Sequence, residues 1–218
     1  MNKQFWQQRW QENRIGFHLA QTNPLLTQNF SRLSLEKELG VFVPLCGKTL
    51  DMIWLRNQGY RVVGVEISEL AVRSFFTENK LIFAQRREGD FEVYTAEGIT
   101  LYVGDFFSIR PEYVSGCGAV YDRAALVALP PEMRRQYASY LKQILLAPIL
   151  LVSMEYDQRY MSGPPFSVSR AEIESLYRDQ YEIEVILETS ASQDDARLKE
   201  RGLVSLKEFV SLLLPKYV

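Results

Sequence analysis

Short apolar runs alternate along the chain with segments in which apolar residues recur every three or four positions. The first pattern is typical of buried strands and the second of amphipathic helices. We predict strands at residues 41–43, 61–67, 91–95, 99–103, 119–121, 149–156 and 181–189. We predict helices at residues 2–13, 51–58, 69–79, 131–146 and 170–178. The apolar pattern of residues 203–214 fits either a strand or a helix.

Strands that alternate with helices predict an α/β fold, with a mostly parallel sheet and helices on both of its faces. The chain of 218 residues contains no internal repeat, low-complexity segment or linker, so residues 1–218 are expected to form one domain. In sheets of this kind, ligands bind beyond the carboxyl ends of the strands. The residues that directly follow each strand are therefore the candidates for a functional site.

Charge and composition narrow the class of protein. Lys and Arg number 25 against 27 Asp and Glu, and this net charge of −2 gives no electrostatic reason to expect nucleic acid or a membrane as partner. The two cysteines, Cys46 and Cys117, do not indicate a disulfide framework. The first ten residues lack the apolar stretch of a signal peptide, and the longest apolar run is too short to span a bilayer. We expect a monomeric, cytoplasmic protein.

Glu66 is the first residue that indicates chemistry. It ends the predicted strand 61–67 and follows Gly47 by 19 residues. An acid in this place can accept hydrogen bonds from both hydroxyls of an adenosyl ribose, a device of both NAD and S-adenosylmethionine sites. The alternative is a surface glutamate that caps the next helix. We favour the ribose role because the apolar strand would otherwise have no reason to end in an acid.

The turn after the first strand distinguishes between cofactors. An NAD site needs the pattern G-x-G-x-x-G for its pyrophosphate, whereas residues 44–48 contain one glycine, Gly47. S-adenosylmethionine carries an amino-acid tail instead, which a tighter turn can hold. The sequence Gly47-Lys48-Thr49 matches the end of a P-loop, but the required earlier glycine is replaced by Phe42. The turn therefore favours S-adenosylmethionine.

Three further candidates follow strands. Asp105 can reach the adenine amine and Phe106 can flank the ring; the alternative is a helix-capping Asp beside a core Phe. Arg123 places a cation at the ligand edge, where it can hold an anionic substrate or a carboxylate. Its alternative is a salt bridge to Asp122 or Glu155.

Two residues are expected to be structural. His18 is the single histidine, and without a Cys/His/Asp cluster it cannot build a metal site, so we predict no metal and a structural hydrogen bond. Cys46 has no histidine near it in sequence, and we predict a packing role rather than that of a nucleophile.

Several stretches together resemble the thiopurine S-methyltransferase family. They are residues 43–48 (VPLCGK), 63–69 (VGVEISE), 121–126 (YDRAAL) and 163–166 (GPPF), with Phe5-Trp6, Trp10 and residues 16–18 (GFH) near the start. Each motif alone is weak, but they occur in register from residue 5 to about residue 178. The sequence beyond about residue 185 resembles the family less clearly.

The resemblance implies a class I S-adenosylmethionine-dependent methyltransferase, a Rossmann-like fold, with residues 1–20 lying over the cofactor site. It implies a substrate wall that includes Phe17. It implies cofactor contacts at Trp6, Trp10, Leu45, Gly47, Glu66, Asp105, Phe106 and Arg123.

Methyl transfer from a sulfonium is an in-line displacement on an already activated electrophile, so the protein mainly positions and desolvates the reactants. Aromatic and heterocyclic thiols ionise easily, and Arg123 as a catalytic cation would favour the thiolate. Three alternatives stay open. They are methylation of selenium or tellurium oxyanions, an NAD-binding oxidoreductase, and a module that holds the cofactor without turnover.

Overall fold

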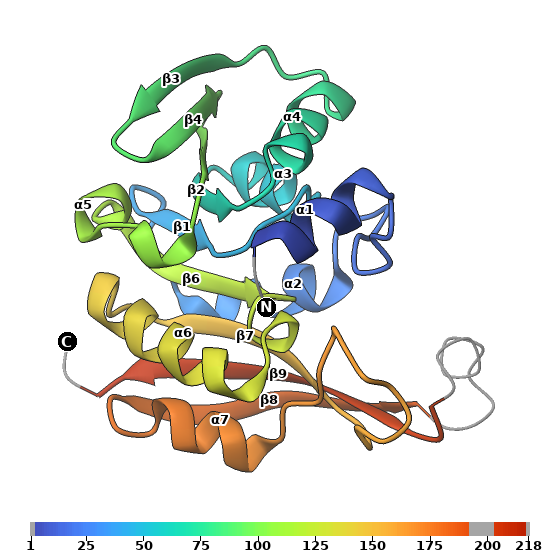
Figure 1. Ribbon diagram of the computed structural model, residues 1–218. Helices are drawn as coiled ribbons and strands as arrows, with labels where there is room; N and C mark the ends of the chain where they lie inside the picture. Colours follow the sequence, from blue (N-terminus) through green and yellow to red (C-terminus); the bar gives the residue numbers. More distant parts are fainter. Residues whose placement is uncertain (1–2, 192–202, 217–218) are drawn as a thin grey trace.

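One mixed sheet forms the centre of the computed structural model, which describes residues 3–191 and 203–216 (Figure 1). Its strand order is β3-β4-β5-β2-β1-β6-β7-β9-β8. The strands are β1 Gly40–Val43, β2 Arg61–Glu66, β3 Ala84–Glu88, β4 Phe91–Ala96, β5 Ile99–Val103, β6 Cys117–Arg123, β7 Ile149–Glu155, β8 Tyr181–Ala191 and β9 Leu206–Pro215.

The predicted parallel arrangement is confirmed for the central strands. β5, β2, β1, β6 and β7 pair in parallel, whereas β3, β4, β8 and β9 add antiparallel pairs at the two edges. The chain order runs outward from β1 in both directions, with β2 on one side and β6 on the other. This reversal of strand order is the place where open α/β sheets bind ligands.

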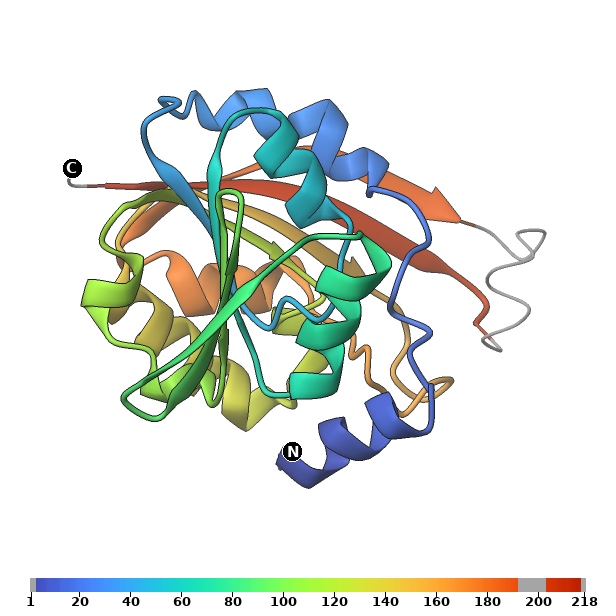
Figure 2. The same cartoon turned by 90° about the horizontal axis from the view of Figure 1, so that it is seen from above.

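The helices cover both faces of the sheet, as predicted (Figure 2). Helices α2, η1, α3 and α4 pack into one apolar cluster with the sheet, and α5, α6 and α7 pack into the other. All four residues of β1 are buried, because a central strand of a covered sheet has no exposed face. The helices are α1 Lys3–Gln11, α2 Pro24–Asn29, η1 Phe30–Leu33, α3 Asp51–Asn57, α4 Glu69–Glu78, η2 Phe106–Ser108, α5 Pro111–Val114, η3 Leu126–Ala128, α6 Pro131–Ile144 and α7 Arg170–Tyr177.

Local capping explains where several helices begin. The Ser68 side chain accepts a hydrogen bond from the amide of Ala71 and starts α4 directly after β2. Ser169 caps α7 in the same way, through the amide of Glu172. Pro131 occupies the first turn of α6, where its missing N–H leaves no backbone bond unmade.

The structure adds elements that the hydrophobic pattern does not predict: α2, η1, β3 and α5, with the short helices η2 and η3. The undecided segment 203–214 is largely strand β9, which inserts between β7 and β8. Within the part of the chain that the structure describes, no helix has the length and apolar character needed to cross a membrane.

Candidate active site

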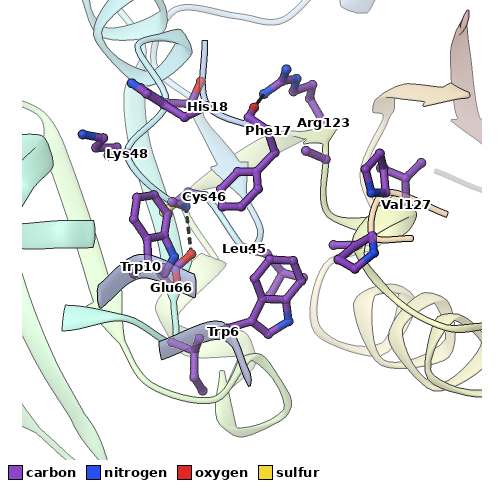
Figure 3. Close-up of a pocket in the computed structure, with 17 residues that line it drawn as sticks. Trp6, Trp10, Phe17, His18, Leu45, Cys46, Lys48, Glu66, Arg123 and Val127 are labelled. Atoms are coloured by element: carbon purple, nitrogen blue, oxygen red, sulfur yellow. Dashed lines mark hydrogen bonds between the residues drawn. The ribbon is translucent and has the colours of Figure 1, made fainter. Parts of the chain in front are cut away.

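A pocket opens at the carboxyl ends of β1, β2 and β6, beneath the N-terminal segment (Figure 3). It encloses about 780 Å³ of empty space, including solvent at its mouth. Five parts of the chain contribute to its wall: the N-terminal segment, the turn after β1, the end of β2, the loop after β6 and a proline pair. The lining residues are Trp6, Trp10, Phe17, His18, Leu45, Cys46, Gly47, Lys48, Thr49, Glu66, Ile67, Arg123, Ala124, Val127, Ala128, Pro164 and Pro165.

Glu66 is a buried carboxylate at the end of β2, with 5% of its surface exposed. Its two oxygens accept hydrogen bonds from the amides of Gly47 and Ser68, each at 2.9 Å. Burial raises the pKa of Glu66 to about 7, and these amide bonds partly oppose the rise. Because Glu66 also lines the pocket, its remaining lone pairs are available to a ligand's hydroxyl groups.

The turn after β1 is folded back onto the end of β2. The amide of Cys46 donates to the carbonyl of Val65 at 3.0 Å, next to the Gly47–Glu66 bond. Gly47 has φ +53°, and a β-carbon on it would lie 3.1 Å from the Trp10 ring. A side chain at this position would have an unfavourable backbone conformation and would press against the indole, so glycine suits it best.

Two residues other than glycine in the pocket wall have a left-handed backbone. Leu45 has φ 47° and Ala124, directly after Arg123, has φ 62°. Such conformations are unfavourable for residues with a β-carbon and concentrate at binding and catalytic sites. The strain thus falls on the two loops, after β1 and β6, that flank the reversal of strand order.

The N-terminal segment covers the pocket with three aromatic rings (Figure 3). The ring of Phe17 meets Trp6 and Trp10 edge to face, with centroids 5.7 and 5.5 Å apart. The segment is tied to the start of α3 at Asn23, whose amide donates to the buried carboxylate of Asp51 at 2.7 Å. Trp6, Trp10 and Phe17 thus line the same pocket as Glu66, and their roles toward cofactor and substrate stay predictions.

Arg123 bonds to this cover. Its Nη1 donates to the carbonyl oxygen of Phe17 at 2.9 Å. The neighbouring Asp122 instead accepts hydrogen bonds from the Tyr137 hydroxyl at 2.6 Å and from the amide of Leu126 at 3.1 Å. Arg123 is therefore a pocket cation that contacts the N-terminal segment, rather than the partner of Asp122.

A lysine and the histidine also line the same pocket. Lys48 forms an ion pair with Glu78 at 2.7 Å. Burial, followed by the nearby charge of Lys48, lowers the pKa of His18, while Glu78 and Asp51 oppose this effect. His18 was expected to be structural, yet its side chain faces the pocket with Lys48 and Arg123.

Cys46 is buried in the turn after β1 and packs into an apolar cluster, which agrees with the packing role predicted for it. Burial, and then the charge of Glu66, raise the pKa of its thiol well above the ordinary value. A thiol held protonated in this way is a poor nucleophile. Among the described residues, no group of three His, Cys, Asp or Glu side chains is placed to hold a metal ion.

Asp105 and Phe106 do not line this pocket. Asp105 is exposed and caps η2, accepting a hydrogen bond from the amide of Phe107 at 3.0 Å. Phe106 is buried against Phe42 and Tyr137. Both positions match the capping and core alternatives that the sequence left open, and the cofactor role of these two residues stays a prediction.

Several wall residues were missed by sequence reasoning, and most of them are apolar. They are Ile67, Ala124, Val127, Ala128, Pro164 and Pro165, together with the polar Lys48 and Thr49. An apolar residue in a loop carries no chemical signal of its own. The proline pair was visible only as part of a stretch that resembled a family.

The pocket fits an adenosyl sulfonium better than a dinucleotide. A buried carboxylate, Glu66, stands where a ribose can be held, and aromatic rings close the other side. The turn that would face a pyrophosphate has a single glycine, Gly47, and its amide is already bonded to Glu66.

Solved structures share this fold. An S-adenosylmethionine-dependent methyltransferase from Anabaena variabilis is 15% identical, with a TM-score of 0.65 over 99% of this chain and 96% of its own. A magnesium protoporphyrin IX methyltransferase from Synechocystis, with bound S-adenosylhomocysteine, is 13% identical, with a TM-score of 0.62 over 97% and 99%. The class I methyltransferase fold predicted from the sequence is thereby confirmed.

Sequence comparison adds the family. The family model described as thiopurine S-methyltransferase matches residues 1–216. A thiopurine S-methyltransferase from Pseudomonas paraeruginosa is 47% identical over 98% of this chain and 99% of its own length. Another, from Pseudomonas fluorescens, is 44% identical over 96% and 97%. The chain is a methyltransferase and belongs to the thiopurine S-methyltransferase family.

Proposed function

We propose that this enzyme transfers the methyl group of S-adenosylmethionine to the sulfur of aromatic and heterocyclic thiols. The observation that carries the proposal is one pocket that joins a buried ribose-type carboxylate, Glu66, to an aromatic cover and the cation Arg123. The names of the similar proteins, thiopurine S-methyltransferases, support the acceptor class.

The residues divide into a cofactor side and an acceptor side. Glu66 would accept hydrogen bonds from the ribose hydroxyls, while the turn at Leu45 and Gly47 would face the amino-acid tail. Trp6 and Trp10 would cover the cofactor. We further propose that the adenine end extends beyond the pocket in Figure 3, toward Asp105 and Phe106.

S-adenosylmethionine supplies a methyl group that a sulfonium has already activated. The protein's own contribution is to exclude water and to hold the acceptor sulfur in line with that methyl. Phe17 forms one wall of the acceptor side, and Arg123 favours the ionised sulfur. In the transfer the bond from acceptor sulfur to methyl forms as the bond from sulfonium to methyl breaks, and the thiol proton leaves to solvent.

A second acceptor class is favoured by one feature of the charge distribution. Two cations, Lys48 and Arg123, line the described part of the pocket beside one carboxylate, Glu66, and Glu78 outside the wall pairs with Lys48. Small oxyanions of selenium or tellurium would be attracted to such a site. We therefore keep their methylation as the second candidate.

A panel of acceptors decides between the two candidates. The purified enzyme is incubated with labelled S-adenosylmethionine and aromatic thiols, heterocyclic thiols, selenite or tellurite, and methylated products are identified by mass spectrometry. We expect turnover of the aromatic and heterocyclic thiols. Turnover confined to the oxyanions would replace the first candidate by the second, and cofactor binding without any transfer would contradict both.

The aromatic cover should become more ordered when the cofactor site is filled. We expect amide hydrogen exchange in residues 5–18 to slow on addition of S-adenosylhomocysteine, because Trp6 and Trp10 would then pack against a ligand. The hairpin of β3 and β4 lies at the sheet edge, outside the pocket, and serves as the internal control. Equal exchange in residues 5–18 with and without ligand would mean that the segment is no lid.

The remaining proposals concern the setting in which the enzyme works. We propose a cytoplasmic monomer that acts on small molecules and needs no nucleic acid. The net charge of −2 is consistent with this assignment. Light scattering of the purified protein during size exclusion tests the oligomeric state.

A further inference from the structure

We propose that Arg134 is a positioning residue that sets the acceptor side of the pocket. The proposal rests on the function proposed above, because that function defines which side holds the acceptor. Trp6 and Phe17 lie on one side of the pocket, and Val127 faces them from the other (Figure 3). The far wall is built from the loop around η3 and from the pair Pro164-Pro165.

A single buried guanidinium contacts both of these wall segments. Arg134 projects from α6, and 2% of its surface is exposed. Its Nε donates to the carbonyl of Leu129, directly after η3, at 2.7 Å. Its charged end lies 5.8 Å from the ring centroid of Phe166, the residue that follows the two prolines.

The two wall segments are also bonded to each other. The amide of Phe166 donates to the carbonyl of Val127 at 2.7 Å, so the proline loop and η3 share a backbone hydrogen bond. A β-carbon on Gly163 would come within 2.5 Å of the Phe166 ring, which leaves the ring no room to shift toward the loop. The two segments are therefore linked to each other, and Arg134 contacts both.

Glu172 holds the guanidinium of Arg134 through an ion pair. Both of its carboxylate oxygens accept from Nη1 of Arg134, at 2.6 and 2.7 Å, and Glu172 lies in the first turn of α7. Arg134 is buried in this pair, whereas the side chain of Glu172 is 30% exposed. The pair restricts the guanidinium to the position from which it contacts both wall segments.

The chain offers a matched control on the same two helices. Lys142, also on α6, bonds to Asp179 at 2.8 Å and to the carbonyl of Leu176 at 2.9 Å, near the other end of α7. This second contact joins α6 to the end of α7, but its hydrogen bonds go to Leu176 and Asp179 rather than to η3 or the proline loop. A loss that arises from loosening α6 against α7 should therefore appear in both variants.

The test compares Arg134→Met and Lys142→Met with the wild type. In Arg134→Met we expect the KM for a bulky aromatic thiol to rise about tenfold or more, since small misplacements of a wall disturb alignment strongly. The KM for a small single-ring aromatic thiol and the Kd of S-adenosylhomocysteine should stay within about twofold, because neither depends on the far wall. Lys142→Met should leave all three values unchanged. Arg134→Lys, which keeps the pairing charge, should recover part of the loss.

Two further measurements keep the proposal open to refutation. If Arg134→Met does not fold, Glu172→Gln is the substitute, because it keeps the shape of the side chain and loses its charge. In this variant the KM for the bulky aromatic thiol should also rise, by a smaller factor. Hydrogen exchange of residues 126–129 and 163–167 should quicken in the Arg134 or Glu172 variant and not in Lys142→Met. This readout needs no acceptor, so it still decides the role of Arg134 if the wild type methylates none of the thiols. Exchange of these residues at the wild-type rate in the Arg134 and Glu172 variants would overturn the proposal. An equal change in KM for both thiols would overturn it as well.

Discussion

Replacement of Glu66 by alanine should weaken S-adenosylmethionine binding by about 1–3 kcal/mol, the scale for a hydroxyl that loses a charged hydrogen-bond partner. The physical reason is that Glu66 is the one carboxylate among the described residues of the pocket wall, and the amides of Gly47 and Ser68 hold it in place. Calorimetry with the purified variant measures the effect. Glu69→Ala is the matched control, because it removes a nearby carboxylate outside the pocket and should leave the Kd unchanged. An unaltered Kd in folded Glu66→Ala would remove Glu66 from the cofactor site.

The same residue gives the binding a pH dependence of known sign. Burial raises the pKa of Glu66 to about 7, so below that pH the ligand-free carboxyl is mostly protonated. The carboxylate is a stronger acceptor for two hydroxyls than the protonated carboxyl, so the affinity should rise between about pH 6 and about pH 8. The variant Glu66→Gln should lose this pH dependence of the affinity.

For folding the pH dependence has the opposite sign. The folded protein holds the proton of Glu66 more tightly than the unfolded chain, so the contribution of Glu66 to the free energy of unfolding falls from about pH 4.5 to about pH 7.

The second large effect is expected at Arg123. In Arg123→Gln, turnover of weakly acidic aromatic thiols at saturating cofactor should fall about 10–100-fold, because a nearby cation lowers a thiol pKa by one to two units. Thiols that are already ionised should lose little. A glutamine amide can still donate to the carbonyl of Phe17, so the substitution removes the charge and keeps a donor for the cover.

Arg123→Lys is the companion variant, since it retains the charge. We expect it to keep most of the turnover of weakly acidic thiols, and we expect the loss in Arg123→Gln to grow with thiol pKa across a graded series. A loss that stays flat over the series would show that Arg123 does not stabilise the thiolate. A rise in the cofactor KM with unchanged saturated turnover would instead identify Arg123 as an anchor for the cofactor.

The central strands and the pocket acid were predictable because their signals are local. A strand that is buried on both faces reads as an unbroken apolar run, and Glu66 stands out as the acid at the end of such a run. The edge strand β3 has the sequence AQRRE and is mostly exposed, so burial leaves no mark on it. Residues 209–214 of strand β9 (FVSLLL) are apolar except for one serine, and such a run has no period that separates strand from helix.

The residues of the site also differ in whether they carry a local sequence signal. Glu66, Gly47 and Arg123 were found because an acid, a glycine or a cation after a strand carries chemical meaning. Val127 and the proline pair gave no such signal, since their place in the wall depends on contacts between distant segments, such as the bond from Phe166 to Val127. Asp105 shows that a local signal can also have two interpretations. An acid after a strand can cap a helix or bind a ligand, and the sequence is the same in both cases.

The position of β9 inside the sheet has a consequence for biosynthesis. The chain leaves the ribosome from its N-terminus, so β7 and then β8 emerge before the strand that must lie between them. Until β9 arrives, β7 presents an open row of amides and carbonyls, and β8 has no neighbour to pair with. Unpaired strand edges of this kind invite pairing with other chains. The nascent enzyme thus passes through a stage in which its active-site strands can be complete while its aggregation-prone edge is still unprotected.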